Sequence, residues 1–321
     1  MELAEIMASE IRANGPMPFH RFMELALYHP RFGYYAGTRD PFGHEGDFYT
    51  NAQLQPVFGR LVAQQLDRWR RAMGSPDSFT VLELGPGRGE TGDEIRRCMP
   101  DVNWIPVEHD GCWPDRPVVG AVFCNEFFDA LPVDLVERRG NGWIEWRVGL
   151  SESGFAWQPG GCHVTRRGLP RIGEGRRIET CERQVAAMER IDSVLAQGWV
   201  LAIDYGYTHD EVERAGRFPD GSLMGYYRHR ADPDVLVEPG RRDITAHVNF
   251  SALEDCGRAA GLEVFPLQTQ QAFLLGVGEP DSFAYALAAG TEMRRTALRM
   301  LLKSLLFGLG ETFRALVMRK G

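Results

Sequence analysis

The chain has 321 residues, and 36 basic against 44 acidic side chains give it a formal net charge of −8. This acidity argues against nucleic acid and other polyanions as partners. With 44% hydrophobic and 25% charged residues, the composition is that of a globular protein and excludes a disordered or fibrous chain. The length predicts one large domain or two smaller ones.

Six cysteines are spread along the chain without a C-x-x-C pair, and no His cluster has metal-ligand spacing. We therefore expect reduced thiols, no metal and a cytoplasmic location. The first ten residues hold three glutamates and no arginine, which argues against a secretory signal or a mitochondrial transit peptide. The apolar stretch at 298–318 is interrupted by Lys303, Glu311 and Arg314, which argues against a membrane span.

Apolar residues at helical spacing predict three helices in the N-terminal part, at about residues 3–11, 18–28 and 59–73. Between the second and the third lies a loop rich in glycine and aromatic residues, at 29–51. Loops of this length inside a compact domain tend to be functional or disordered. We therefore treat this loop as a candidate functional segment.

Short apolar runs with the pattern of buried strands follow the third helix. They lie at 79–84, 118–125, 198–206, 261–267 and 313–318. Helical patterns such as residues 181–195 separate several of them, so the order predicts an α/β fold with a sheet covered on both faces. Alternating residues around three glycines at 133–160 predict a β-rich insertion.

The segment LELGPGRGE, residues 82–90, lies where a predicted strand turns into a helix. Gly85, Gly87 and Gly89 allow a tight turn and a close approach of a ligand to the backbone, and the helix N-terminus adds partial positive charge. A loop of this kind is typical of a nucleoside cofactor site. The alternative is a purely structural turn.

Two details favour S-adenosylmethionine over NAD in this loop. The spacing G-x-G-x-G places Glu90 where a dinucleotide fingerprint has its last glycine. Glu83, at the strand end, could take up an amino group directly or through water, whereas a pyrophosphate would be repelled. Glu108 lies 23 residues after Gly85 and is the candidate acid for the ribose.

A second polar cluster, NEFFDALPV at 125–133, follows the run that ends at Cys124. It places Asn125, Glu126 and Asp129 at the carboxyl end of a strand, the edge where open α/β sheets bind ligands. The motif DYG at 204–206 ends another strand in the same way. A helix cap and a solvated turn are the alternative interpretation of the first motif.

At these motifs the sequence resembles the MidA-like class I methyltransferases, and the matches run in order from about residue 10 to residue 318. The motifs are YHPRFGYYAG (28–37), GDFYTNAQLQPVFG (46–59), LELGPGRG (82–89), NEFFDALPV (125–133), AIDYG (202–206), GYYRHR (225–230), DITAHVNFSAL (243–253) and TQQAFLLGVG (269–278). The family includes the mitochondrial complex I assembly factor that methylates arginine on a partner subunit. The resemblance implies S-adenosylmethionine as cofactor and a protein as substrate.

The same resemblance implies the domain organisation. Residues 1–75 would form an N-terminal helical cap with an active-site loop. Residues 76–321 would form the methyltransferase core, with the β-rich insertion at about 133–180. The core would be a seven-stranded Rossmann-like sheet.

Site residues are carried over position by position. The resemblance implies that Gly85, Gly87 and Gly89 form the cofactor loop, with Glu83 near its methionine end, and that Asn125 and Glu126 line the active site. Asp47 and Thr50 match a loop that closes over the cofactor and substrate. Four further residues fall in matching motifs: Tyr205 and His229, which would bind substrate, and Asp243 and His247. Of these, Asp243 and His247 have packing and capping as the alternative role.

Two departures from the family are visible. Only 35 residues separate Gly89 from Asn125, because a strand-and-helix segment is missing here. Either Glu108 is the ribose acid, or VEHDGC (107–112) corresponds to the stretch that flanks the adenine and Asp110 is the relevant side chain. Where family loops commonly have T-S-P-E, residues 50–53 read T-N-A-Q, so an amide replaces a carboxylate.

We therefore predict a methyltransferase that acts on a protein arginine. A guanidinium stays protonated and needs carboxylates to orient it, and Glu126 with Asp129 is the best pair for that role, beside Asn125. The alternative is a non-catalytic assembly or scaffold protein that keeps the fold. An NAD-dependent oxidoreductase is disfavoured by the loop spacing. No nucleic acid or membrane partner is expected, and the oligomeric state is not predicted.

Overall fold

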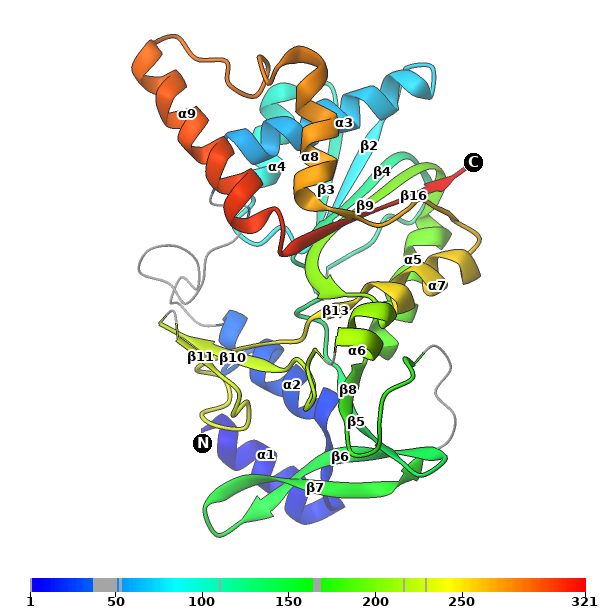
Figure 1. Cartoon of the computed structure of the whole chain (residues 1–321), viewed down its shortest axis with the longest axis vertical. Coiled ribbons are helices and arrows are strands. Elements are labelled where there is room, and N and C mark those ends of the chain that lie inside the picture. Colours follow the sequence, from blue (N-terminus) through cyan, green and yellow to red (C-terminus); the bar gives the residue numbers. More distant parts are fainter. Residues whose placement is uncertain are drawn as a thin grey trace. The chain divides into compact units, whose positions relative to one another are not determined.

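The computed structural model describes residues 2–36, 51, 54–109, 111–163, 169–215, 217–228 and 230–321. The chain divides into two compact units. The first unit consists of Met1–Tyr49, Asp129–Val185 and Tyr207–Ala252, and the second of Thr50–Phe128, Ala186–Gly206 and Leu253–Gly321. Each unit can be followed by its element labels in Figure 1.

The first unit combines two N-terminal helices with short and long strands. Its elements are α1 (Leu3–Asn14), β1 (Met17–Pro18), α2 (Phe19–Tyr28), the 3₁₀ helix η1 (Tyr34–Ala36), β5 (Asp134–Arg139), β6 (Gly142–Ser151), β7 (Gly154–His163), β8 (Arg177–Thr180), α6 (His209–Ala215), β10 (Met224–Tyr227), β11 (Arg230–Asp232), β12 (Asp243–Thr245) and β13 (Val248–Asn249). Two helices cross its boundary with the second unit: α5 (Glu182–Val194) and α7 (Phe250–Ala259).

The predicted β-rich insertion is confirmed as an antiparallel sheet with the order β1-β6-β5-β8, in which β7 also pairs with β6. The tight connection between β5 and β6 contains Gly140 with φ 53°, a left-handed conformation that glycine adopts without steric cost. The apolar face of α2 packs on this sheet, and the ring of Phe22 meets Phe155 edge to face at 5.3 Å. This apolar contact gives the first unit its own core. A second antiparallel sheet has the order β11-β10-β12.

The second unit is built around one mixed sheet. Its elements are α3 (Val57–Ala72), β2 (Thr80–Leu84), α4 (Glu90–Cys98), β3 (Asn103–Val107), β4 (Val118–Asn125), β9 (Leu195–Tyr207), β14 (Glu263–Val264), β15 (Gln268–Thr269), α8 (Gln270–Gly278), the 3₁₀ helix η3 (Glu279–Asp281), α9 (Glu292–Ser304), the π-helix η4 (Leu305–Leu309) and β16 (Phe313–Lys320). The α/β fold class is therefore confirmed.

The sheet of the second unit has the order β14-β16-β9-β4-β2-β3, with β15 beside β16. Strands β3, β2, β4 and β9 are parallel, whereas β16 is antiparallel to β9. The expected count of seven strands was wrong: within the described ranges the sheet has eight strands, six of them on this path and two, β13 and β15, beside it. In the described residues between β3 and β4 there is no helix or strand, in agreement with the expectation that a strand-and-helix segment is missing there.

Apolar side chains bury both the sheet and its helices. The five residues of β2 are all buried, as expected for a central parallel strand. Phe58 and Leu66 of α3 pack in one cluster with Phe123 of β4 and Ile203 of β9. Helices α3 and α4 come so close that a Cβ on Gly59 would lie 2.7 Å from Glu94 Cβ.

The predicted helices agree with α1, α2, α3 and α5, and four of the five predicted strands are strands of several residues. The fifth, at 261–267, is a strand only at Glu263–Val264. The expected boundary between a cap at 1–75 and a core at 76–321 stays a prediction, and α3 belongs to the second unit. Within the described ranges, no helix combines the length and apolarity needed to cross a bilayer.

Candidate active site

The carboxyl ends of four parallel strands lie at one edge of the sheet in the second unit. In the register of the sheet, Leu84 of β2 is beside Val107 of β3 and Cys124 of β4, and Asn125 is beside Ile203 of β9. The residues that follow these strands therefore share the edge where open α/β sheets bind ligands. This edge carries most of the site residues predicted from the sequence.

The glycine loop after β2 has the conformation that its sequence predicts. Gly85, Gly87 and Gly89 have φ values of 65°, 55° and 74°, all in the left-handed region. Gly89 caps the N-terminus of α4, and its carbonyl accepts from the N–H of Asp93 at 2.8 Å. A Cβ on Gly89 would meet no atom within 4 Å. The loop thus leaves open space at the helix N-terminus, where backbone N–H groups point outward.

Glu83 lies beneath α4. Its side chain is 3% exposed, and its Oε2 accepts a hydrogen bond from Trp104 Nε1 at 2.8 Å. Burial raises the pKa of Glu83 to about 7, although the Trp104 hydrogen bond lowers it, and the charges of Glu108 and Asp93 add to the rise. The carboxyl group therefore changes its charge near neutral pH.

Glu108 follows β3 directly, on the strand next to β2. Burial raises the pKa of Glu108, and the N–H of Gly87, which donates a hydrogen bond to its carboxylate, partly lowers it. The residue thus contacts the glycine loop from the end of the adjacent strand. This placement favours Glu108 over Asp110 as the ribose acid, and Asp110 lies outside the described residues.

Asn125 is the last residue of β4, and Glu126 follows it directly. Glu126 has φ 52°, which is unusual for a residue with a side chain and marks backbone strain. Its N–H donates to the carbonyl of Ile203 at 2.9 Å, and its Oε1 accepts from Asn125 Nδ2 at 3.0 Å. Strain of this kind persists where the surroundings hold it, often at functional sites.

Two residues missed by the sequence reasoning complete this cluster. The N–H of Asn51 donates to Glu126 Oε1 at 2.9 Å, and Asn51 Nδ2 donates to Gln270 Oε1 at 2.8 Å. Asn51 and Gln270 are both 0% exposed. Both lie in motifs that carry the family resemblance, but an amide has no chemical signature that assigns it a role before its partners are known.

Asp204, from the DYG motif, forms hydrogen bonds with the backbone next to the same cluster. It is 0% exposed, and its carboxylate accepts from the N–H of Phe128 at 3.0 Å and from that of Tyr205 at 2.9 Å. It therefore fixes the backbone that follows Glu126. Tyr205 is half-buried, and its ring meets Phe313 edge to face at 5.5 Å. Its predicted contact with substrate stays a prediction.

Asp129 belongs to the first unit, so its pairing with Glu126 stays a prediction. It is buried, and its carbonyl accepts from the N–H of Ala246 at 3.1 Å. Asp243 is 1% exposed in the same unit and accepts from Tyr35 Oη at 3.1 Å. Burial, with the nearby positive charge of Arg217, lowers the pKa of His247 to about 4.

Three of the predicted substrate-binding residues cannot be placed. Asp47, Thr50 and His229 lie outside the described residues. Among the residues that are described, no group of three or more His, Cys, Asp or Glu side chains could hold a metal ion.

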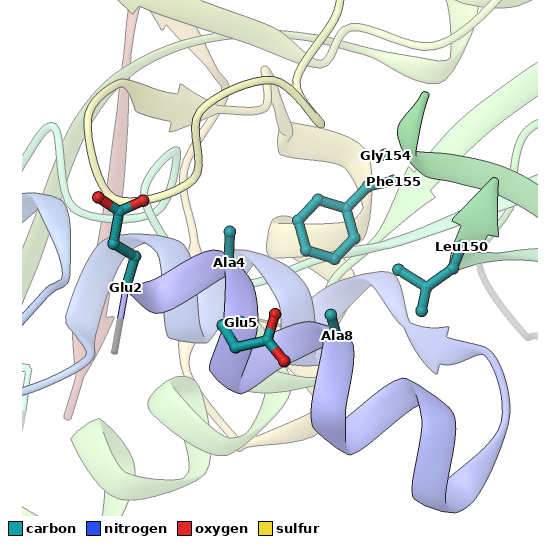
Figure 2. Close-up of a pocket in the computed structure, with 7 residues that line it drawn as sticks. All are labelled: Glu2, Ala4, Glu5, Ala8, Leu150, Gly154 and Phe155. Atoms are coloured by element: carbon teal, nitrogen blue, oxygen red, sulfur yellow. The ribbon is translucent and has the colours of Figure 1, made fainter. Parts of the chain in front are cut away.

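A surface pocket of about 470 Å³ lies elsewhere, in the first unit. It is lined by Glu2, Ala4, Glu5, Ala8, Leu150, Gly154 and Phe155. Figure 2 shows the alanines of α1 on the side of the ring of Phe155, with Glu5 of the same helix and Glu2, which precedes the helix, beside them. None of the predicted site residues lines this pocket.

Solved structures and curated proteins resemble this chain over most of its length. A protein of Burkholderia thailandensis, described as a likely methyl transferase and crystallised with S-adenosyl-homocysteine, superposes with a TM-score of 0.85. The two share 29% sequence identity, over 99% of this chain and 92% of that one. A native structure of a superfamily protein from the same organism has a TM-score of 0.80 at 28% identity, over 99% of this chain and 91% of that one.

Among curated proteins, the Drosophila melanogaster protein arginine methyltransferase NDUFAF7 homolog is 29% identical over 81% of this chain and 70% of its own length. The human protein arginine methyltransferase NDUFAF7 is 24% identical over 84% of this chain and 71% of its own. Both are named mitochondrial. Residues 95–268 match a family model described as "Putative S-adenosyl-L-methionine-dependent methyltransferase". The match covers more than half of the chain, which therefore belongs to this family of S-adenosylmethionine-dependent methyltransferases.

Proposed function

We propose that this methyltransferase transfers a methyl group to an arginine side chain of a protein, and that Glu126 binds the acceptor guanidinium. The observation that carries the proposal is the fixed carboxylate of Glu126 at the sheet edge that also holds the glycine loop. The names of the fly and human relatives support arginine as the acceptor.

The residues at the sheet edge suit a cationic nucleoside cofactor. The sulfonium of S-adenosylmethionine supplies an electrophilic methyl group when it is bound. The open space at Gly89 lets a ligand approach the backbone, and Glu108 would hold the ribose hydroxyls. The carboxylate of Glu83 would balance the positive charge of the cofactor's amino group. Two carboxyl groups beside the loop would repel a pyrophosphate, so the donor set fits this cofactor better than a dinucleotide.

The acceptor needs orientation more than acid–base chemistry. A guanidinium keeps its proton because its pKa exceeds about 12, so a carboxylate must bind its N–H groups and balance its charge. Alignment of this kind supplies about 7–11 kcal/mol in well-oriented reactions. We assign this task to Glu126 and include Asp129 as the second carboxylate of the proposal.

The test compares Glu126→Gln with a matched control, Glu254→Gln. Glu254 lies on α7 in the same unit, where it pairs with Arg258 on the surface. The wild type or a variant is incubated with labelled S-adenosylmethionine and with proteins from a lysate of a cell that lacks this gene. Mass spectrometry then identifies the labelled residue. Binding of S-adenosyl-homocysteine is measured by calorimetry.

We expect wild type and Glu254→Gln to form methylarginine equally. Glu126→Gln should lower the rate about 100-fold, while the Kd of S-adenosyl-homocysteine changes less than about threefold, because the lost contact is to the acceptor. An equal loss of transfer and of binding would refute the assignment of Glu126. Binding without any transfer by the wild type would favour a non-catalytic scaffold.

A further inference from the structure

The side chains of Gln270, Asn51, Asn125 and Glu126 form one directed series of hydrogen bonds in the second unit. Gln270 Nε2 donates to Asn51 Oδ1 at 3.0 Å, and Asn51 Nδ2 donates to Asn125 Oδ1 at 3.1 Å. Asn125 Nδ2 then donates to Glu126 Oε1 at 3.0 Å. In these three hydrogen bonds the donor is always the residue farther along the series from the carboxylate, and hydrogen bonds aligned in this way strengthen one another.

Asn51 connects this series, because it forms hydrogen bonds with all three of the other residues. Its amide makes a reciprocal pair with Gln270, and its main-chain N–H reaches Glu126 Oε1 at 2.9 Å. Because Asn51 and Gln270 are both 0% exposed, water cannot replace a lost partner of either amide. A rotated amide would place donor against donor, so the series has one favourable arrangement.

The backbone fixes both amides at points distant in sequence. Gln270 is the first residue of α8, and the side chain of Thr269 caps this helix by accepting from the N–H of Ala272 at 3.1 Å. The carbonyl of Asn51 accepts from the N–H of Leu54 at 3.0 Å, just before α3. The start of α8 and the turn that precedes α3 thus determine the positions of the two amides.

We propose that Asn51 and Gln270 are positioning residues that orient the carboxylate of Glu126 toward the methyl acceptor. The inference rests on the proposed function, in which Glu126 binds the guanidinium. The strained backbone at Glu126 fixes the origin of its side chain, and its end is held by the main-chain N–H of Asn51 and by Asn125 Nδ2. The amide of Gln270 acts on this end through Asn51. A carboxylate held at both ends does not have to be ordered when the acceptor binds, which is the advantage of preorganisation.

The variant that tests this role is Gln270→Met, which keeps the side-chain volume and removes the amide. Gln271→Met is the matched control, because Gln271 lies in the same helical turn and outside the series. Initial rates of methyl transfer to the lysate proteins, Kd for S-adenosyl-homocysteine and Tm are measured for each. Gln270→Met should lower the rate about tenfold or more with an unchanged Kd, and Gln271→Met should match the wild type.

A double-mutant cycle separates positioning from a general structural effect. If Gln270 acts through Glu126, then Gln270→Met made in the Glu126→Gln background should cause no further loss of rate. Independent losses that multiply in the double variant would overturn the inference. Should Gln270→Met fail to fold, Asn51→Asp replaces it in the same cycle, because it keeps the shape and removes the donor to Asn125.

The outcome for the wild type distinguishes the two claims. Transfer by the wild type with an unaffected Gln270→Met variant would overturn the positioning role and leave the proposed function intact. No transfer by the wild type, with S-adenosyl-homocysteine bound, would overturn the proposed function and this inference with it.

Discussion

Trp104 donates a hydrogen bond from its indole Nε1 to Glu83 Oε2 at 2.8 Å, in a part of the second unit where the carboxyl group is 3% exposed. A Cβ on Gly92 of α4 would lie 2.5 Å from that same oxygen. The helix therefore covers the carboxyl group, and one indole does not offset the loss of water around its charged form. The raised pKa of Glu83 follows from this enclosure.

The first prediction concerns stability against pH. The pKa of Glu83 rises from 4.5 to about 7 on folding, so between these values the folded state holds a proton that the unfolded state has lost. Stability must then fall as pH rises from 4.5 through 7. Glu83→Gln removes this loss and should raise the free energy of unfolding at pH 8 by about 1–3 kcal/mol, with no such gain at pH 4.5. Urea unfolding of the wild type and the variant at the two pH values measures this difference in stability. An equal change in the free energy of unfolding at both pH values would contradict the prediction.

The second prediction concerns cofactor binding through the same group. If Glu83 compensates the amino group of the cofactor, binding favours the ionised carboxylate. The affinity for S-adenosyl-homocysteine should then increase about tenfold between pH 6 and pH 8 in the wild type and stay flat in Glu83→Gln. Calorimetry across this range decides it. A slope that persists in Glu83→Gln would assign the titration to another group.

The third prediction separates ligand approach from backbone strain. Gly89 and Gly74 have φ values of 74° and 79°, and a Cβ on either would meet no atom within 4 Å. Alanine at each should therefore cost about 1–2 kcal/mol of stability. Only Gly89→Ala should also weaken the binding of S-adenosyl-homocysteine, by about tenfold, because the methyl group of the alanine occupies the space beside the helix N-terminus. Equal Kd values for the two variants would argue against a ligand at Gly89.

The fourth prediction assigns the two acidic groups to different parts of the cofactor. Glu108→Gln should weaken the binding of both adenosine and S-adenosyl-homocysteine, by about tenfold each, because the variant lacks a charged acceptor for the ribose hydroxyls. Glu83→Gln should leave adenosine binding unchanged, since adenosine has no amino-acid part. Calorimetry with both ligands measures the four values. Unaltered adenosine binding in Glu108→Gln would return the ribose role to Asp110.

Local features of the fold were predictable because their causes are local. The strand at 79–84, the turn with its three glycines and the helix after it form one continuous signal of apolar burial and permissive backbone. The strand at 261–267 was predicted too long, since β14 is a short edge strand that pairs only with β16. An apolar run does not indicate how many of its residues will find a neighbouring strand.

By itself, the sequence determined the α/β class, the family resemblance and the residues at the ends of the strands, because strand periodicity and a glycine turn act over a few residues. Only the tertiary structure decided that Asn51 contacts Gln270, 219 positions away. It also decided that Glu108 accepts a hydrogen bond from the N–H of Gly87, and that six strands follow one another in the order of the described sheet. Contacts of this kind depend on how buried faces pack together, and amide groups with two donors and two acceptors could satisfy many partners until that packing selects one.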